Sequence, residues 1–168
     1  MPAFSARVLG GLVVAALVGF AAAPAAPDSA PVRKIVVALP FEEAELILKT
    51  EAQRQNLNLV NVLDIKKGME NRDGTFRPYK IYQFCNLELG VRIYSDSPDY
   101  GAFQLCSVLI YEVDPTHTAL VSARQGWTLQ RLPGHAPGPS AVAAAREFER
   151  KTDEIFEAVL EEARSKAK

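Results

Sequence analysis

The chain has 168 residues, with 19 Lys and Arg, 20 Asp and Glu, and a formal net charge of −1. This balance argues against a nucleic-acid role, because nucleic-acid-binding domains usually show a basic excess gathered on one face. A chain of this length can bury a core without obligatory metals or several disulfides, so one domain is expected.

The N-terminal residues predict a secretory signal peptide. Arg7 precedes an uninterrupted apolar run over 8–20, which is followed by a tract of Ala and Pro. The run is shorter than the roughly 20 residues that a spanning helix needs. We therefore expect a signal peptide over 1–25, a mature chain that begins at Ala26, and a periplasmic or secreted protein. An uncleaved membrane anchor is the alternative, and without Arg7 the net charge becomes −2.

After a Pro- and Ala-rich tether at 26–31, we expect a single domain over 32–165. A β-branched run at 35–39, stopped by Pro40, predicts a buried strand. An acidic first turn and an apolar stripe then predict an amphipathic helix that ends near Asn56. The residues of the stripe are Phe41, Ala44, Leu48 and Ala52.

Two antiparallel strands are expected next, over 57–65 and 79–85, on either side of a polar loop. Residues typical of turns in this loop are Gly68, Asn71, Asp73 and Gly74. Asn86 favours the cap position of a short helix that ends at 96–98.

A hairpin follows, with strands over 103–113 and 118–124 joined by a turn at Asp-Pro-Thr-His. The density of Gly and Pro over 125–139 predicts a long loop without regular structure. Ser140 is expected to cap the strongest helix of the chain. The resulting order, β-α-β-β-α-β-β-α, predicts a two-layer α+β fold, with an antiparallel sheet and helices on one face.

Cys85 and Cys106 flank the helix in the middle of the chain. In an oxidising compartment the pair indicates first a structural disulfide, which would close a loop of about 20 residues and stabilise the fold by roughly 3 kcal/mol. Two buried free thiols without a function are one alternative. In another, Cys85 lies beside a helix N-terminus that stabilises its thiolate for redox chemistry or a soft metal.

Other motifs with known chemistry are missing from the sequence. His117 and His135 stand in a predicted turn and a predicted loop, without metal-binding spacing. There is no G-x-S-x-G elbow and no glycine-rich phosphate loop. Trp127 is expected to pack under the long loop, or to line a ligand cleft.

The order Phe84-Cys85-Asn86, a helix, and Leu105-Cys106 leading into Ile110-Tyr111-Glu112 resembles the domain-of-unknown-function 302 family over roughly 35–121. Its members place a cysteine and a small polar residue before a helix, and then a Pro-Cys step before a strand that ends in Tyr-Glu. Leu105 stands where the family often has Pro. The resemblance implies a compact α+β fold similar to the TATA-binding-protein-like architecture, and no established reaction or catalytic residues.

The leading interpretation is an exported module that binds a small ligand or a protein partner, more as a binder than as an enzyme. Candidates for the cleft are Asn86, Tyr111, Glu112 and Trp127. The alternative is a periplasmic protein for thiol redox chemistry, or for soft-metal or haem handling, that uses Cys85 and Cys106. Cofactors and catalytic residues stay unassigned, a homodimer is left open, and no membrane contact is expected after cleavage.

Overall fold

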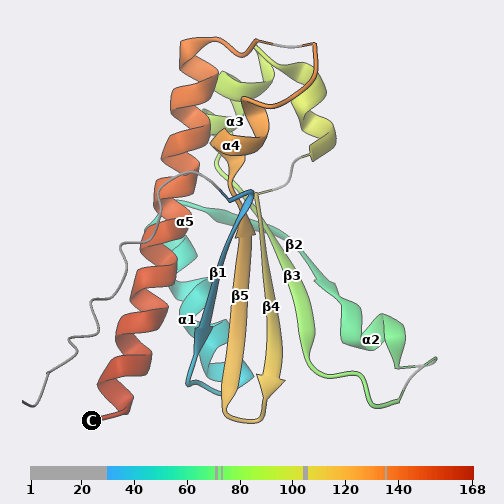
Figure 1. Ribbon diagram of the computed structural model, residues 1–168, viewed down its shortest axis with the longest axis vertical. Coiled ribbons are helices and arrows are strands. Elements are labelled where there is room, and N and C mark those ends of the chain that lie inside the picture. The colour runs from blue at the N-terminus through green and yellow to red at the C-terminus, as the bar shows by residue number, and fades with distance from the viewer. Residues whose placement is uncertain (1–29, 71, 73, 104–105, 135) are drawn as a thin grey trace, which may run out of the picture.

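The computed structural model describes residues 30–70, 72, 74–103, 106–134 and 136–168. The predicted signal peptide and most of the tether lie outside these residues, as do Asn71, Asp73, Leu105 and His135. The longer elements follow the order β-α-β-β-α-β-β-α, with helices packed on one side of an antiparallel sheet (Figure 1). The predicted α+β fold class is therefore confirmed.

Five strands form one open sheet in the order β1-β5-β4-β3-β2, and every neighbouring pair is antiparallel. Their bounds are Val32–Val37 (β1), Asn58–Asp64 (β2), Tyr79–Cys85 (β3), Cys106–Asp114 (β4) and His117–Ala123 (β5). The β4–β5 hairpin lies inside the sheet, so β1 and β2 are its edges. All seven residues of β2 are exposed, and its register with β3 shifts between Leu59 and Asn61, which marks a β-bulge.

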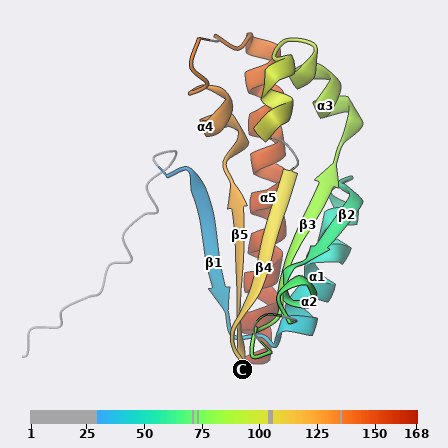
Figure 2. The ribbon, with the colours of Figure 1, turned by 90° about the vertical axis from the view of Figure 1, so that its right-hand side faces the viewer.

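Two long helices, α1 (Phe41–Arg54) and α5 (Pro139–Lys166), build the core against the sheet. Helix α5 is about 42 Å long at 1.5 Å per residue, and Figure 2 shows it running along the strands on their far side. Strand residues of the core are Val37, Tyr82, Phe84, Val108, Ile110 and Leu120. Helix residues that meet them include Leu48, Phe148, Ile155, Phe156 and Val159. In the described part of the chain, no helix combines the length and hydrophobicity needed to cross a bilayer.

Three short elements gather at one end of the sheet, beside the first half of α5 (Figure 1). They are α3 (Leu87–Tyr94), the 3-10 helix η1 (Pro98–Phe103) and α4 (Gln125–Leu129). A further short helix, α2 (Ile65–Met69), follows β2. Its first turn is capped by the Asp64 side chain, which accepts a hydrogen bond from the Lys67 amide at 2.9 Å.

The prediction of a loop without regular structure over 125–139 was wrong, because α4 forms there. The Glu149 carboxylate on α5 accepts hydrogen bonds from the backbone amides of Gly126 at 2.9 Å and Trp127 at 3.4 Å. These are amides that the start of a helix leaves without intrahelical partners. A tertiary contact therefore stabilises a helix that local propensity does not favour.

Three other local predictions were also wrong. Ser140 does not cap α5: Gly138 is the N-cap, Pro139 is the first helical residue, and the Ser140 hydroxyl instead accepts a hydrogen bond from Arg92 at 3.3 Å. The strand expected from residue 103 begins at Cys106, because the residues up to Phe103 belong to η1. Part of the polar loop after β2 forms helix α2.

Candidate functional site

The long helices leave one face of the sheet turned away from them, and we call it the open face. Tyr82, Val108 and Leu120 point inward and are buried, so the neighbouring strand residues point outward. The outward residues that the register aligns are Val32, Lys34, Val36, Ala119, Val121, Ala123, Ser107, Leu109, Tyr111, Tyr79, Ile81, Gln83, Cys85, Asn58, Asn61 and Leu63. These residues define the open face.

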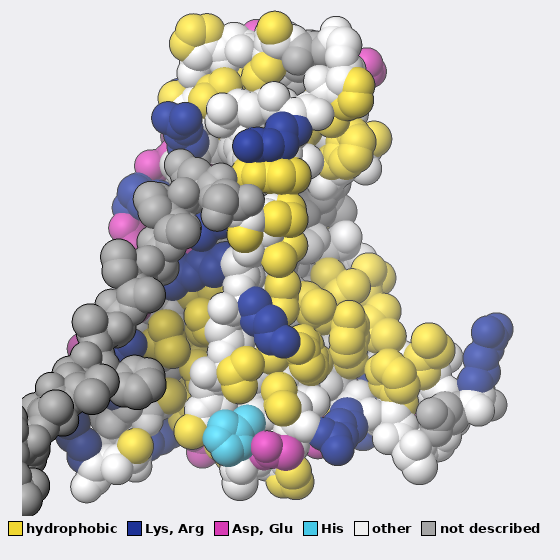
Figure 3. Space-filling view, in the orientation of Figure 1, with side chains coloured by type: hydrophobic (Ala, Val, Ile, Leu, Met, Phe, Trp, Pro, Cys, Tyr) yellow, Lys and Arg dark blue, Asp and Glu magenta, His cyan; other side chains and the backbone are white. Residues whose placement is uncertain are grey.

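The open face is unusually apolar for a solvated sheet surface. Antiparallel sheets with one face in water commonly alternate apolar residues inward with polar residues outward. Here Val36 and Leu63 are 48% and 41% exposed, and Lys34 is the one charged residue among the outward positions defined above. Figure 3, which shows this side of the molecule, places hydrophobic side chains over much of the sheet. Binding of another molecule to the open face would therefore remove apolar side chains from water.

An aromatic group lies near the hairpin end of the open face. The rings of Tyr79 and Tyr111 stack with their centroids 5.8 Å apart, and Phe76 lies 6.1 Å from Tyr79. The Lys34 ammonium lies 5.4 Å from the centre of the Tyr111 ring, a distance typical of cation–π contacts. Tyr111, a predicted cleft residue, therefore lies on the open face between Tyr79 and Lys34, and its contribution to ligand binding stays a prediction.

The two cysteines lie at the other end of the sheet, and neither is part of a disulfide in the structure. Cys106 is the register partner of Phe84 and is buried, whereas Cys85 is half-buried and belongs to the open face. Burial, together with the nearby thiols of Cys106 and Cys85, raises the pKa of Tyr94 to about 12. The structure thus brings both thiols near one phenol, and the disulfide stays a prediction.

Asn86 is buried at the N-terminus of α3 and does cap this helix, as predicted. Its Oδ1 accepts a hydrogen bond from the Leu89 amide, and its Nδ2 donates one to the Asn56 carbonyl, each at 3.1 Å. The residue also lines an open cavity of about 450 Å³ between α3 and α5, together with Arg92 and Lys151. The cap and the link to Asn56 account for its conformation, so its contribution to ligand binding stays a prediction.

Glu112 and Trp127 lie apart from this cavity. The Glu112 amide donates a hydrogen bond to the Pro78 carbonyl at 2.9 Å, next to the aromatic group. The Trp127 ring packs under the Arg131 guanidinium, 4.2 Å from the ring centroid, and lines a cavity of about 110 Å³. Asn86 and Trp127 therefore line different cavities, and the four predicted residues are spread over the molecule.

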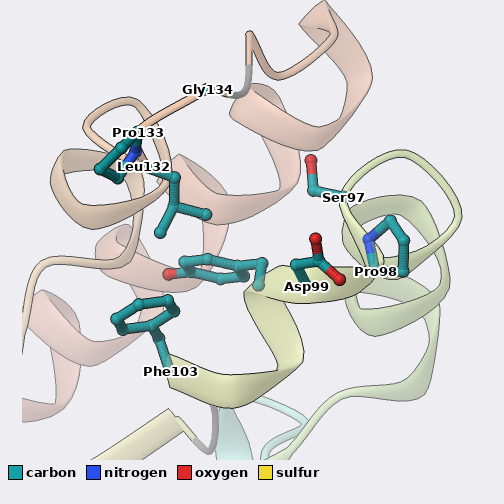
Figure 4. A pocket seen from close by; sticks show the side chains of 8 residues that line it. Ser97, Pro98, Asp99, Phe103, Leu132, Pro133 and Gly134 are labelled. Atoms are coloured by element: carbon teal, nitrogen blue, oxygen red, sulfur yellow. The ribbon is translucent and has the colours of Figure 1, made fainter.

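A further cavity of about 290 Å³ lies between η1 and the loop that follows α4. Figure 4 shows Phe103 and Leu132 on its apolar side and the Asp99 and Ser97 oxygens on its polar side. Tyr100 also lines it; the ring is fully buried, and its hydroxyl donates to Gln125, 2.6 Å from Oε1 and 2.9 Å from the carbonyl oxygen.

Glu45 on α1 is a buried carboxylate that sequence analysis did not single out. Its Oε1 accepts hydrogen bonds from Lys80 Nζ at 2.7 Å and from the Tyr82 hydroxyl. Burial raises the pKa of Glu45, but these hydrogen bonds and the Lys80 charge outweigh it and hold the pKa below its ordinary value. The signal was available, because Glu45 follows Phe41 by four residues and so falls on the apolar stripe of the helix.

The described residues hold no group of three or more His, Cys, Asp or Glu side chains arranged to hold a metal ion. His117 is the first residue of β5, directly after the hairpin turn, and its Nδ1 is 3.0 Å from the Asp114 carboxylate. Hydrogen bonds from Thr116 and His117 hold the pKa of Asp114 well below its usual range. These contacts at the hairpin turn account for the position of the His117 side chain.

Comparisons with known proteins agree with this fold. The chain is 27% identical, over 74 residues, to an uncharacterized protein of Aquifex aeolicus (strain VF5), a match that spans 44% of the chain and about half (46%) of that protein. The fold is similar to the crystal structure of an uncharacterized conserved DUF302 protein from Bacillus stearothermophilus, with a TM-score of 0.66 and 13% identity, over 77% of this chain and 98% of the other. The family model for the domain of unknown function DUF302 matches residues 33–159, and the chain therefore belongs to the DUF302 family.

Proposed function

We propose that this protein acts by binding, that its binding surface is the open face of the sheet, and that a second copy of the chain covers that face. The supporting observation is a row of apolar side chains on a sheet face that the long helices leave uncovered. Contiguous exposed apolar patches of several hundred Å² mark interaction sites on soluble proteins.

A second copy fits this face because little charge would be removed from water. Lys34 is the charged residue of the open face, and its ammonium already lies over the Tyr111 ring. Two such faces can therefore pack without burying unpaired carboxylates, which would be costly. Face-to-face packing of two sheets, at about 10 Å separation, is the arrangement that sandwiches use.

The size of the face is also consistent with a dimer. Five strands about 4.8 Å apart, with about six residues of 3.3 Å each, give a surface of roughly 24 Å by 20 Å. Two copies that cover this face completely would bury about 1,000 Å² in total, close to the lower limit for a specific interface. We expect a reversible dimer rather than an obligate one.

Sedimentation velocity over a range of protein concentrations tests the dimer. Wild-type protein should shift from monomer to dimer as the concentration rises. The double variant Val36→Lys/Leu63→Lys places charges on the two edges of the open face and should stay monomeric. The matched control Leu46→Lys/Leu87→Lys changes residues of α1 and α3 that are 62% and 77% exposed, and it should dimerise like wild type.

Two results would contradict the proposal that a second copy of the chain covers the open face. One is a wild-type protein that stays monomeric at every concentration reached. The other is an equal loss of the dimer in the control variant, which would place the contact elsewhere.

We also propose that the mature protein acts outside the cytoplasm, as the apolar run and the Ala-rich tract after Arg7 indicate. Cell fractionation with intact-mass measurement tests this: the exported protein should begin at Ala26. Full-length protein in the cytoplasmic fraction would reject it, and full-length protein in the membrane fraction would support the anchor instead.

A thiol function is the second candidate, and it is supported by two cysteine side chains near Tyr94 that are not joined in a disulfide. If Cys85 and Cys106 form a disulfide in the exported protein, its intact mass should be two hydrogens below the dithiol mass. If they cycle or hold a soft metal, Cys85→Ser should abolish the redox response or the metal adduct while leaving the fold intact. Loss of stability alone would assign the pair a structural role.

A further inference from the structure

The indole nitrogen of Trp127 is buried and makes no hydrogen bond with the described residues. One other buried side-chain atom of the described chain is in this state, Nε of Arg124, but the Arg124 guanidinium still lies 3.9 Å from the Asp153 carboxylate. An indole N–H is a donor only. Because a buried donor without an acceptor costs free energy, an acceptor that reaches this N–H would recover it.

Trp127 lines the cavity of about 110 Å³ between α4 and α5, and the charged residues around it are Arg131, Arg146 and Glu149. A buried water needs only about 10–15 Å³ of such space, so the cavity is large enough for a group of several atoms. Two guanidinium groups and one carboxylate give its walls a formal charge of +1. The cavity therefore favours an anion over a cation.

Arg146 brings an uncommitted guanidinium to this cavity. Its side chain is exposed, and no hydrogen bond or ion pair joins it to another residue that the structure describes. The stem of Arg146 lies against the start of α4, where Gly126 has no side chain: a Cβ on Gly126 would lie 3.2 Å from Arg146 Cγ. Packing thus holds Arg146 at the cavity, and its donors are available to a ligand.

The other two charged residues leave room for an anion. Glu149 Oε1 accepts hydrogen bonds from the Gly126 and Trp127 amides, so the donors of a ligand site here are side chains rather than backbone. Arg131 lies over the indole ring and donates to the Trp127 carbonyl at 3.2 Å through Nη1. Because the Arg131 side chain is exposed, it can shift to open the indole N–H and donate through its remaining N–H groups.

We propose that this cavity binds an oxyanion, the phosphate or carboxylate group of a small molecule, which accepts hydrogen bonds from the Trp127 indole N–H and from the guanidinium groups of Arg131 and Arg146. Guanidinium groups match both oxyanions, because their parallel N–H donors can bind two oxygens at once. The residues of this site lie outside the open face, so the site does not depend on the proposed dimer.

Titration of the purified protein with sodium phosphate, and separately with sodium acetate, tests the site by nitrogen-15 NMR. Trp127 is the single tryptophan of the chain, so its indole N–H gives one cross-peak. We expect a saturable downfield shift of this proton, because the anion accepts its hydrogen bond. Sodium chloride at equal ionic strength controls for screening and should not produce the shift. Tighter binding of phosphate would identify a phosphate ligand, and tighter binding of acetate a carboxylate ligand.

A pair of arginine variants locates the anion. Arg146→Gln removes a guanidinium from an exposed side chain, so the fold should be kept while phosphate binding weakens by about tenfold. Arg150→Gln is the matched control, since Arg150 is also exposed on α5, but its guanidinium pairs with two carboxylates of the same helix. It should bind phosphate nearly like wild type.

Trp127→Phe tests the indole N–H itself. The variant keeps an aromatic ring beneath Arg131 but removes the donor, and it should weaken phosphate binding several-fold. The measurement then follows the Arg131 backbone amide, because the indole cross-peak is lost.

The site is rejected if neither phosphate nor acetate shifts the indole proton at millimolar concentrations, or if chloride shifts it equally. It is also rejected if Arg146→Gln binds phosphate like wild type, or if Arg150→Gln loses as much affinity as Arg146→Gln. Unchanged phosphate binding in Trp127→Phe would remove the indole from the site and overturn the proposal as well.

Discussion

The hydroxyl of Tyr100 joins η1 to α4, because it donates to the carbonyl and the side chain of Gln125. Tyr100→Phe leaves the buried Gln125 oxygens without this donor and should lower the free energy of unfolding by about 1–3 kcal/mol. Urea unfolding measures the change as a lower midpoint with an unchanged slope. Tyr111→Phe is the control, since the Tyr111 hydroxyl makes no hydrogen bond with the described residues, and an equal loss there would contradict the assignment.

Glu45 should make stability depend on pH in the acidic range. Its pKa is below the ordinary 4.5 in the folded protein, so the unfolded chain binds more protons and stability increases with pH. The contribution is fully present above about pH 4.5 and is lost as the pH falls below that value. Urea unfolding at several pH values should show a shallower acidic decline for Glu45→Gln than for wild type. Glu42→Gln should follow the wild-type profile.

At the scale of elements, α4 depends on α5 through Glu149, which accepts from the amides of Gly126 and Trp127. Glu149→Ala should loosen α4 and expose Trp127, the single tryptophan of the chain. The expected readout is a red-shifted Trp emission that external quenchers reach more easily. Glu147→Ala, which removes a carboxylate paired with Arg150 on the same helix, is the control. Unchanged emission in Glu149→Ala would show that α4 does not need this contact.

The strands and long helices were predictable because their hydrophobic residues repeat with the period of a strand or a helix. The five-residue helix α4 was not, because its amides are bound by Glu149, 23 residues later in the chain. Ser140 was misassigned because Pro139 starts the helix one residue earlier. The β-branched run at 35–39 predicted a buried strand, and this was wrong, because β1 is an edge strand whose outward residues, such as Val36, belong to the open face. The face of the sheet on which the helices pack depends on tertiary contacts, which local sequence patterns do not show.

On the scale of the whole molecule, α5 closes the core. It supplies several large side chains that meet the sheet and α1, among them Phe148, Ile155, Phe156 and Val159. A chain that ends after Gly138 should therefore lose cooperative unfolding and bind a hydrophobic dye such as ANS, as compact states without specific packing do. A chain that ends after Lys166 loses only two exposed residues and should unfold cooperatively. Cooperative unfolding of the shorter chain would disprove the closing role.

The pairing of β1 with β5 brings residues 32–37 against residues 118–123. Helix α5, which comes later in the chain, then packs on the core that these strands help to form. Contacts between residues so distant in sequence form slowly, because a large loop must close before they stabilise the fold. During synthesis, β1 therefore waits without its partner until more than 80 further residues have been added. The native core can form only after the ribosome has translated α5, so the export that we propose would act on a chain that has not yet folded.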